Sequence, residues 1–346
     1  PVDVLASRSL VAKALLPATT DKGLVPGMEN IIISENELLT FNDRKCVSAL
    51  VDKGLEFTCA VNANDLSKIL KGIKEKEFDI YLEDGQLVIV SDTTEAELPT
   101  NSDTIDDILN MIEELDIPSL KFKSLPKNFI EGVSISEGIV SDDQNSEAKA
   151  YCLKVSDNTM YATDRFRCSR FFLEGEIDPI LLPKNLLTDI CSFNPTKISV
   201  GKKWCHFTND SGIVFSGRLV NDEENKFFGI DKAFENIPEG GLEIKLPSEL
   251  KEILENILSL HDEKTESHKT IKVEIIEGEM VIEFKRPRAV VKKIIKIEDT
   301  DLKISFNISS SFFYKILDYT DVFTVHKNMT IFETNNFEQM TMLAAE

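Results

Sequence analysis

The sequence predicts an α+β protein built from three tandem domains, each with two helices packed on antiparallel sheets. Two observations support this fold class. One β-α-β-β-β pattern recurs six times along the 346 residues. In each copy, hydrophobic residues follow a helical period in one segment and alternate with polar residues in the segments around it. Two copies per domain give domains of about 115 residues, a common domain size.

Each predicted helix begins at a small or polar residue or at a proline. The six starts are about 60 residues apart, near Ala6, Asn64, Pro126, Pro183, Pro247 and Ser309. Proline suits the first helical turn, where its missing N–H costs no hydrogen bond. The side chains of Asn64 and Ser309 can cap free N–H groups. Leu66 and Leu70 then keep the spacing of one helix face.

The segments between the helices are predicted to be strands, because hydrophobic and polar residues alternate along them. They turn at short polar loops such as Asp84-Gly85 and Lys327-Asn328. Domain boundaries are predicted after the acidic segment 101–119 and at the linker 237–241. The domains are therefore expected to span residues 1–119, 120–238 and 239–346.

The composition argues against membrane and metal-binding classes. No run approaches the roughly 18 apolar residues of a membrane span, and residues 1–20 lack the basic start of a signal peptide, so we expect a cytoplasmic protein. The six cysteines show no CxxC spacing, which indicates free thiols in a reducing compartment. Cys205-His206 is the one adjacent Cys/His pair, and neighbours in a strand point to opposite faces. We therefore expect no metal and no cofactor.

Motifs of the common enzyme classes are missing from the sequence. It contains no Gly-rich phosphate loop, no HExxH and no GxSxG. The pairs Asp106-Asp107 and Asp142-Asp143 lack the companions of a metal site and are interpreted as solvated charge. We therefore expect no catalytic residues and no enzymatic activity.

Several motifs occur in an order that resembles one known family. The segment YATDRFRCSR (161–170) resembles the family's Ala-Thr-Asp-Gly-His-Arg-Leu turn, and PILLPKNLLTDI (179–190) its Val-Pro-Arg-Lys helix start. IVFSGRLVND (213–222) resembles its Ser-Lys-Leu-Val-Asp strand, and EQMTML (338–343) its closing Val-Met-Pro-Met-Arg-Leu. Residues 9–33 resemble its opening helix and loop. The family is the bacterial DNA polymerase III beta-subunit sliding clamps, and the resemblance covers essentially the whole chain.

The chain also departs from the family pattern. Arg165-Phe166 stands where the family has Gly-His, the Phe-Pro-Asp-Tyr run after the Leu-Val-Asp strand is missing, and residues 344–346 follow the expected end. A divergent member, such as one encoded by a bacteriophage, would show these departures. The resemblance implies a DNA sliding clamp, a processivity factor whose DNA-clamp domains form a ring with helices inside and strands outside.

The resemblance further implies the partners of the chain. These are double-stranded DNA bound without sequence preference, a DNA polymerase, a clamp-loader ATPase and a second copy in a head-to-tail homodimer, within the bacterial cytoplasm or nucleoid or a phage-infected host. The free edge strand of domain 1 would pair with that of domain 3. Residues 92–98 are the candidate edge, although they are polar where the family has apolar residues. The alternative is a clamp-like repeat scaffold or protein-interaction module that does not encircle DNA.

The net charge of −21 opposes DNA binding unless charge is segregated, because phosphates need a positive surface. The six predicted helices are together close to neutral, so the excess acid lies on strands and loops. Such an exterior repels DNA while the interior tolerates it. The alternative for each helix lysine is that it simply belongs to a solvated helix surface and contacts no DNA. The residues predicted to face DNA are Arg8, Lys13, Lys22, Lys68, Lys71, Lys74, Lys127, Lys184, Lys251 and Lys315.

One basic segment, KRPRAVVKKIIK (285–296), stands apart from these helices. It alternates like a strand in the outer layer of domain 3. A charged strand face that balances the acidic surroundings is the favoured interpretation. A nucleic-acid contact and a localisation signal are the alternatives.

Family clamps bind a short linear peptide of their partners between domains 2 and 3. Two methionines at alternate strand positions would offer this peptide a soft, adaptable surface. Ordinary core packing is the alternative role for these residues. By resemblance, the pocket would use Thr163, Arg165, Phe166, Arg167, Cys168, Gly229, Ile230, Met340, Met342 and Leu343.

Overall fold

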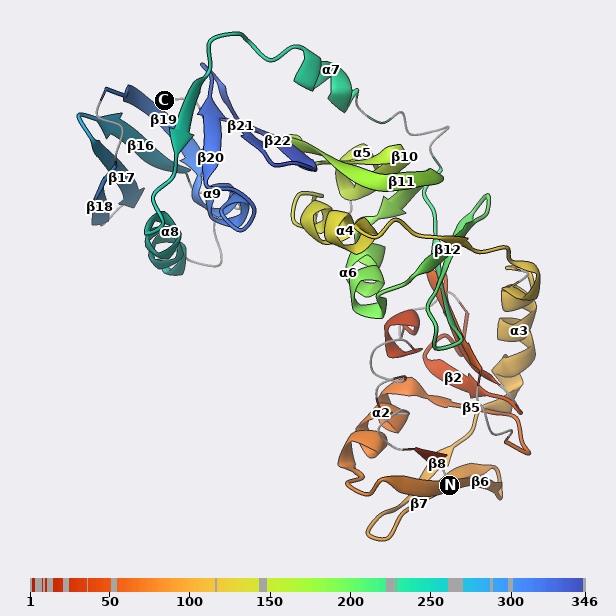
Figure 1. Ribbon diagram of the computed structural model, residues 1–346. Helices are drawn as coiled ribbons and strands as arrows, with labels where there is room; N and C mark the ends of the chain where they lie inside the picture. Colours follow the sequence, from red (N-terminus) through yellow and green to blue (C-terminus); the bar gives the residue numbers. More distant parts are fainter. Residues whose placement is uncertain are drawn as a thin grey trace. The chain divides into compact units, whose positions relative to one another are not determined.

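The computed structural model contains the predicted β-α-β-β-β repeat in its second, fourth, fifth and sixth copies (Figure 1). The third copy has a second helix and two long strands, and most of the helix predicted to begin near Ala6 lies outside the described residues. The structure describes residues 2–3, 8, 10, 15–20, 25–35, 37–50, 55–115, 117–142, 148–221, 227, 229–260, 270–286, 289–297 and 301–344. Two units are distinguished by their internal contacts. Unit 1 comprises Pro1–Glu137, Lys154–Asn158 and Glu174–Lys226, and unit 2 comprises Gly138–Leu153, Thr159–Leu173 and Phe227–Glu346.

Unit 1 contains the first two copies and the fourth. Copy 1 supplies β1 (Val2–Asp3), β2 (Asn30–Ile33), β3 (Glu37–Asn42) and β4 (Lys45–Leu50). Copy 2 is β5 (Cys59–Asn62), α2 (Ala63–Gly72), β6 (Glu77–Glu83), β7 (Gln86–Val90) and β8 (Glu95–Pro99). Copy 4 is the end of β11 (Arg167–Pro183), α6 (Lys184–Phe193), β12 (Lys197–Val200), β13 (Trp204–Thr208) and β14 (Ile213–Arg218).

Copy 3 contributes to both units, and copies 5 and 6 belong to unit 2. Copy 3 includes β9 (Lys123–Ser124), α4 (Phe129–Glu137), α5 (Ala148–Tyr151), β10 (Cys152–Thr163) and the start of β11. Copy 5 is β15 (Leu242–Lys245), α8 (Leu250–Ser259), β16 (Thr270–Ile276), β17 (Glu279–Arg286) and β18 (Ala289–Lys296). Copy 6 is β19 (Lys303–Ser309), α9 (Ser310–Ile316), β20 (Val322–Val325), β21 (Met329–Glu333) and β22 (Phe337–Met342). Two further helices are α3 (Ile105–Glu113) and α7 (Ile230–Glu235).

The strands form antiparallel sheets in which the last strands of distant copies pair. Unit 1 contains an eight-stranded sheet, β5-β2-β3-β4-β14-β13-β12-β9, and a four-stranded sheet, β1-β6-β7-β8. Copy 1 joins copy 4 in the former, because β4 pairs with β14 from Lys45↔Gly217 to Ala49↔Ile213. Unit 2 contains the four-stranded sheet β18-β17-β16-β19. In the sheet β10-β11-β22-β21-β20-β15, copy 3 joins copy 6 through Arg167↔Thr341 to Phe171↔Phe337.

Aromatic side chains fill the interior of each unit. In unit 1 the ring of Phe207 lies 6.1 Å from that of Phe129 on α4 and 6.4 Å from that of Phe215 on β14. In unit 2 the rings of Phe323 and Phe332 stack at 5.4 Å. All four of these strand residues and Phe129 are at most 2% exposed. The amphipathic segments predicted from the sequence therefore bury their hydrophobic faces between helix and sheet.

Local differences from the predicted helix starts have simple causes. The cap of α2 is Asn62, whose side chain accepts from the N–H groups of Asn64 and Asp65 at 3.0 and 3.1 Å, so the prediction that Asn64 caps this helix is wrong. Pro126 and Pro247 lie before their helices, in a turn in which their carbonyls accept from Phe129 and Leu250. Ser309 occupies the N-cap position of α9 without a side-chain capping bond.

All six cysteines are free, and four of them are buried. Among the described residues, no helix has both the length and the hydrophobicity needed to cross a membrane. In the same part of the chain, no cluster of three or more His, Cys, Asp or Glu side chains is arranged to hold a metal ion.

A pH effect on stability is expected from His206 on β13. Its side chain is 3% exposed, and its Nδ1 lies 2.8 Å from Ser216 Oγ. Burial lowers the pKa of His206 from 6.5 to about 4, because the charged imidazolium loses its hydration. The unfolded chain then binds this proton at higher pH than the folded chain does, so stability should fall as pH drops from 6.5 towards 4, by up to about 3 kcal/mol.

Urea unfolding of wild type and His206→Gln at several pH values checks this expectation. Carboxylates add their own pH dependence to both proteins, so the difference between the two curves isolates the histidine. Wild type should lose more free energy of unfolding than the variant between pH 6.5 and 4. Parallel curves would show that His206 titrates alike in both states.

Candidate functional site

The predicted pocket residues 163–168 form a tight turn between β10 and β11. Thr163 Oγ1 donates to the carbonyl of Arg167 at 2.6 Å, and Asp164 Oδ1 accepts from the N–H groups of Phe166 and Arg167 at 3.0 and 2.7 Å. Arg165 has a φ of 79°, a left-handed conformation that favours glycine. These bonds hold the turn in one shape and leave Phe166 50% exposed.

The buried side chain of Arg167 stabilises this turn. Its side chain is 6% exposed, and its Nε and Nη2 lie 2.9 and 2.8 Å from Asp164 Oδ2. Nη2 also donates to the carbonyl of Gly138 at 3.0 Å, and the guanidinium lies 3.8 Å from the ring centre of Phe312. Burial lowers the pKa of Arg167, and the Asp164 carboxylate opposes that shift. The guanidinium is thus fully engaged within unit 2 and positions the turn.

The turn lies directly beside the C-terminal strand β22. Cys168 is paired with Met340 in the sheet, and the N–H of Met342 donates to the carbonyl of Phe166 at 2.9 Å. Met340 is 6% exposed and Met342 is 42% exposed. The structure therefore brings the two predicted segments together, with Phe166 and Met342 as adjoining exposed hydrophobic residues.

Helix α7 covers the buried part of this surface. Ile230 and Phe234 on α7 pack with Ile331 and Met340 in one hydrophobic cluster. Burial raises the pKa of the Cys168 thiol, at the edge of this cluster, to about 11, so the thiol is neutral and acts as a small hydrophobe. The partly buried members of the cluster are Tyr161, Cys168, Phe227, Ala233, Ile237 and Met329.

A polar network fixes α7 to the sheet. Arg170 forms ion pairs with Asp231 at 3.2 Å and with Glu338, and its guanidinium lies 4.4 Å from the ring centre of Phe234. The hydroxyl of Tyr161 donates to Asp231 Oδ2 at 2.9 Å. None of these five residues was assigned to the pocket in the sequence analysis. Two of them, Asp231 and Phe234, lie on α7. The amphipathic segment 227–237 is the sequence feature that could have indicated them.

The other pocket residues lie around the same surface. Gly229 is the N-cap residue of α7, and Thr163 is buried at 4% exposure. Leu343 is partly buried, and its N–H donates to the carbonyl of Asn328 at 3.0 Å. The arrangement is a strip of soft apolar side chains along a sheet, which can hold an extended peptide without any chemical step.

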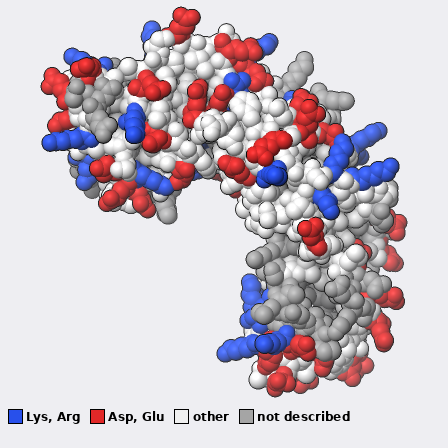
Figure 2. All heavy atoms as spheres, viewed as in Figure 1, with Lys and Arg blue, Asp and Glu red and all other residues white. Residues whose placement is uncertain are grey.

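The predicted DNA-facing residues differ in their exposure and in their contacts with other side chains. Lys68, Lys71 and Lys74 are exposed on or just after α2, and Lys68 contacts Asp65 at 3.3 Å. Figure 2 shows blue side chains gathered over α2 at the lower left, whereas red side chains follow α3 on the right. Within unit 1, basic side chains thus gather over α2 and acidic side chains along α3.

The remaining basic residues are less uniform. Lys127 and Lys315 are exposed. Lys184 donates to the carbonyl of Glu137, and Lys251 forms an ion pair with Asp318. Arg8 is partly buried. Lys13 and Lys22 lie outside the described residues.

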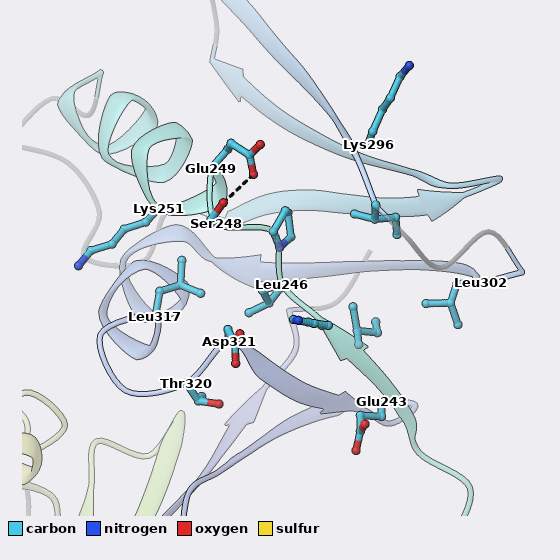
Figure 3. Close-up of a pocket in the computed structure, with 14 residues that line it drawn as sticks. Glu243, Leu246, Ser248, Glu249, Lys251, Lys296, Leu302, Leu317, Thr320 and Asp321 are labelled. Carbon is cyan, nitrogen blue, oxygen red and sulfur yellow. Dashed lines mark hydrogen bonds between the residues drawn. The ribbon is translucent and has the colours of Figure 1, made fainter.

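A separate cavity of about 730 Å³ lies within unit 2, around the connection between β15 and α8 (Figure 3). Its walls mix charges, with Glu243, Glu249 and Asp321 beside Lys245 and Lys296. Figure 3 shows Lys251 directed away from the other lining side chains. The cavity shares no residue with the predicted peptide pocket.

Solved structures similar to this chain are sliding clamps. The DNA polymerase III subunit beta from Pseudomonas aeruginosa aligns with a TM-score of 0.78 at 15% identity, covering 100% of this chain and 99% of that one. The Helicobacter pylori beta clamp bound to a DNA ligase peptide aligns with a TM-score of 0.78 at 15% identity, covering 99% of each chain. The chain has the fold of the DNA polymerase III beta subunit. The sliding-clamp fold predicted from the sequence motifs is confirmed.

The sliding-clamp fold extends over the whole chain. No family model matches the sequence. No curated protein matches it either. A third structure with this fold, a Pseudomonas aeruginosa sliding clamp bound to griselimycin, has a TM-score of 0.79 at 15% identity, covering 100% of this chain and 98% of that one.

Proposed function

We propose that this chain is a DNA sliding clamp, a processivity factor that encircles duplex DNA as a head-to-tail homodimer. In this proposal residues 1–119, 120–238 and 239–346 are its three clamp domains. The observation that carries the proposal is the sliding-clamp fold over the full chain together with the pattern of strand pairing between copies.

The strand pairing supports a closed ring of two chains. The last strand of copy 1 pairs with that of copy 4, and the last strand of copy 3 pairs with that of copy 6. The same rule would pair copy 2 with copy 5, but their last strands, β8 and β18, are edge strands of separate sheets. A second copy supplies the missing partner for each, and two such junctions leave no strand edge of this kind open.

The helix surface of unit 1 supports contact with DNA phosphates. Lys68, Lys71 and Lys74 are exposed on or just after α2, and Lys68 also contacts Asp65 at 3.3 Å. Lysine–phosphate contacts carry no sequence information, so they permit sliding. Solvated lysines tolerate a layer of water between helix and DNA.

The strip formed by Phe166, Met342 and the α7 cluster supports a site for partner peptides. The Helicobacter pylori clamp with the same fold carries a DNA ligase peptide. We propose that a replicative polymerase and a clamp loader bind the strip in turn through short extended peptides. The exposed Phe166 offers a partner side chain an aromatic surface.

Native mass and topological retention test this function together. One chain has a mass of 38.9 kDa, and native mass spectrometry at several protein concentrations should give twice that mass. After loading by a bacterial clamp-loader complex, the protein should stay on nicked circular DNA and leave when the circle is cut. A strict monomer that is not retained on circles would contradict the proposal and favour the scaffold alternative.

A further inference from the structure

We propose that unit 1 holds a second docking site, which binds an extended acidic segment of a partner protein beside the turn between β3 and β4. This site repeats the backbone arrangement of the peptide strip in unit 2, but it carries arginines in place of the exposed apolar side chains. The proposal rests on the peptide strip of the proposed function and goes beyond it to a different surface and a different class of peptide.

The turn between β3 and β4 is closed by the same hydrogen bonds as the turn between β10 and β11. Asn42 Oδ1 accepts from the N–H groups of Arg44 and Lys45 at 2.9 and 2.8 Å. Asp164 Oδ1 likewise accepts from the N–H groups two and three residues further on. In both turns the side-chain oxygen holds the backbone in one shape. Arg44 therefore takes the position that Phe166 has in unit 2.

The strand end beside each turn is attached by three equivalent backbone hydrogen bonds. In unit 2 they run from the N–H groups of residues 342–344, at 2.9, 3.0 and 2.9 Å, to the carbonyls of Phe166, Asn328 and Asn307. In unit 1 they run from the N–H groups of residues 218–220, at 2.9, 2.8 and 3.1 Å, to the carbonyls of Arg44, Lys203 and Leu181. Arg218 at the end of β14 therefore takes the position of Met342 at the end of β22.

An apolar side chain adjoins each of these surfaces. Trp204, the single tryptophan of the chain, lies opposite Arg218 in the sheet, as Met329 lies opposite Met342. Trp204 is partly buried and packs against the cluster that includes residues of α3, whereas Met329 packs against the cluster that includes residues of α7. Each surface thus joins exposed side chains to an apolar cluster beneath a helix.

The exposed side chains of the unit 1 surface are basic. Arg44 and Arg218 are exposed and lie opposite each other, next to the pair Lys45↔Gly217. Like charges directly opposite on neighbouring strands are destabilising. Among the described residues neither arginine forms a salt bridge, and Arg218 Nη1 instead donates to the carbonyl of Asp43 at 3.2 Å. A ligand carboxylate between the two guanidinium groups would relieve their repulsion.

The neighbouring turn adds positive charge in a chain whose net charge is −21. Lys202 and Lys203 are exposed in the turn between β12 and β13, and the partly buried Asp43 offsets only part of this charge. Figure 2 shows blue side chains gathered over the region of β12, above the red side chains along α3. We call this surface the basic strip, and it comprises Arg44, Lys202, Lys203, Trp204 and Arg218.

The chemistry of the basic strip favours an acidic peptide. A guanidinium group can form two parallel hydrogen bonds with one carboxylate. An extended peptide with acidic and apolar residues can place carboxylates on the arginines and an apolar side chain on Trp204. A nucleic-acid backbone would use the charges alone.

A labelled synthetic peptide of about ten residues, with Asp and Val in alternating pairs, tests the basic strip. Its binding should change the emission of Trp204, and fluorescence polarisation should give the dissociation constant. We expect Arg44→Glu/Arg218→Glu to raise this constant at least about tenfold, because two attractive contacts become repulsive. A peptide with Lys in place of Asp should instead prefer the variant, since the charges are then complementary.

A matched control separates the basic strip from the overall charge of the protein. Lys76→Glu/Lys197→Glu makes the same change of charge at two exposed residues of unit 1 outside the basic strip, and it should bind the Asp peptide like wild type. Both double variants should unfold in urea at the wild-type midpoint. Equal affinity of wild type and Arg44→Glu/Arg218→Glu, or an equal loss in the control, overturns the proposal.

Two further ligands distinguish the remaining outcomes. If Arg44→Glu/Arg218→Glu keeps its affinity for the Asp peptide and loses affinity for short linear duplex DNA, the surface is a nucleic-acid contact and the peptide site is rejected. The DNA ligase peptide should bind this variant like wild type, because its site lies in unit 2. Failure of that peptide to bind wild type contradicts the peptide strip, whereas failure of the Asp peptide alone leaves the proposed clamp intact.

Discussion

Met342→Asp is expected to weaken binding of a partner peptide by about 100-fold, as removal of a central hydrophobic contact does at interfaces. Met342 is 42% exposed and adjoins the turn carbonyl of Phe166, so the variant places a charge in the middle of the apolar strip. A carboxylate at this position must lose water when a peptide covers it. Fluorescence polarisation with a labelled DNA ligase peptide measures the change.

A matched control separates this effect from general surface damage. Ile276→Asp introduces the same charge at a residue that is 39% exposed and lies on β16, outside the strip. It should bind the peptide like wild type, and both variants should keep the native mass of wild type. Equal affinity of wild type and Met342→Asp would reject the peptide strip as assigned.

Arg167→Met is expected to destabilise the folded chain by about 3–5 kcal/mol, the usual cost of leaving one member of a buried ion pair alone. The side chain of Asp164 is 9% exposed and would keep its charge without its partner. The carbonyl of Gly138 and the ring of Phe312 would also lose their contacts with the guanidinium. Urea unfolding at pH 7 measures the loss.

Two companion variants identify the cause. Adding Asp164→Asn to Arg167→Met should recover part of the lost stability, because no unpaired carboxylate then stays buried. Arg170→Met should cost less than Arg167→Met, since Arg170 is 23% exposed and its partner Asp231 is 52% exposed. An Arg167→Met protein as stable as wild type would show that the turn does not depend on the Arg167–Asp164 ion pair.

The repeat could be predicted because its signals are local. Hydrophobic spacing such as Leu66 and Leu70 marks a helix face, and these residues are 5 and 3% exposed. Prolines 126, 183 and 247 fall at or just before the helices for a local reason, since proline cannot donate a backbone hydrogen bond. The sliding-clamp fold followed from the order of motifs, although identity to the similar solved structures is only 15%.

Contacts between distant segments could not be predicted in the same way. Arg170 and Glu338 are separated by 168 positions, and nothing in either local sequence marks the other as its partner. Lys184 and Lys251 have the same appearance in the sequence as Lys71, but Glu137 and Asp318 engage them. Which lysines are free depends on packing between copies, and helix periodicity carries no information about it.

The strand β11 also has a genetic consequence. Arg167–Phe171 pair with β22 in unit 2, whereas Glu174–Pro183 continue into unit 1. Because Lys154–Asn158 of β10 also belong to unit 1, unit 2 is encoded in three separate stretches of the gene. A single crossover between two diverged genes, for instance at codon 227, joins β11 of one parent to β22 of the other. Recombinants would therefore inherit mismatched cross-strand neighbours, so point substitution preserves this protein better than exchange of whole segments.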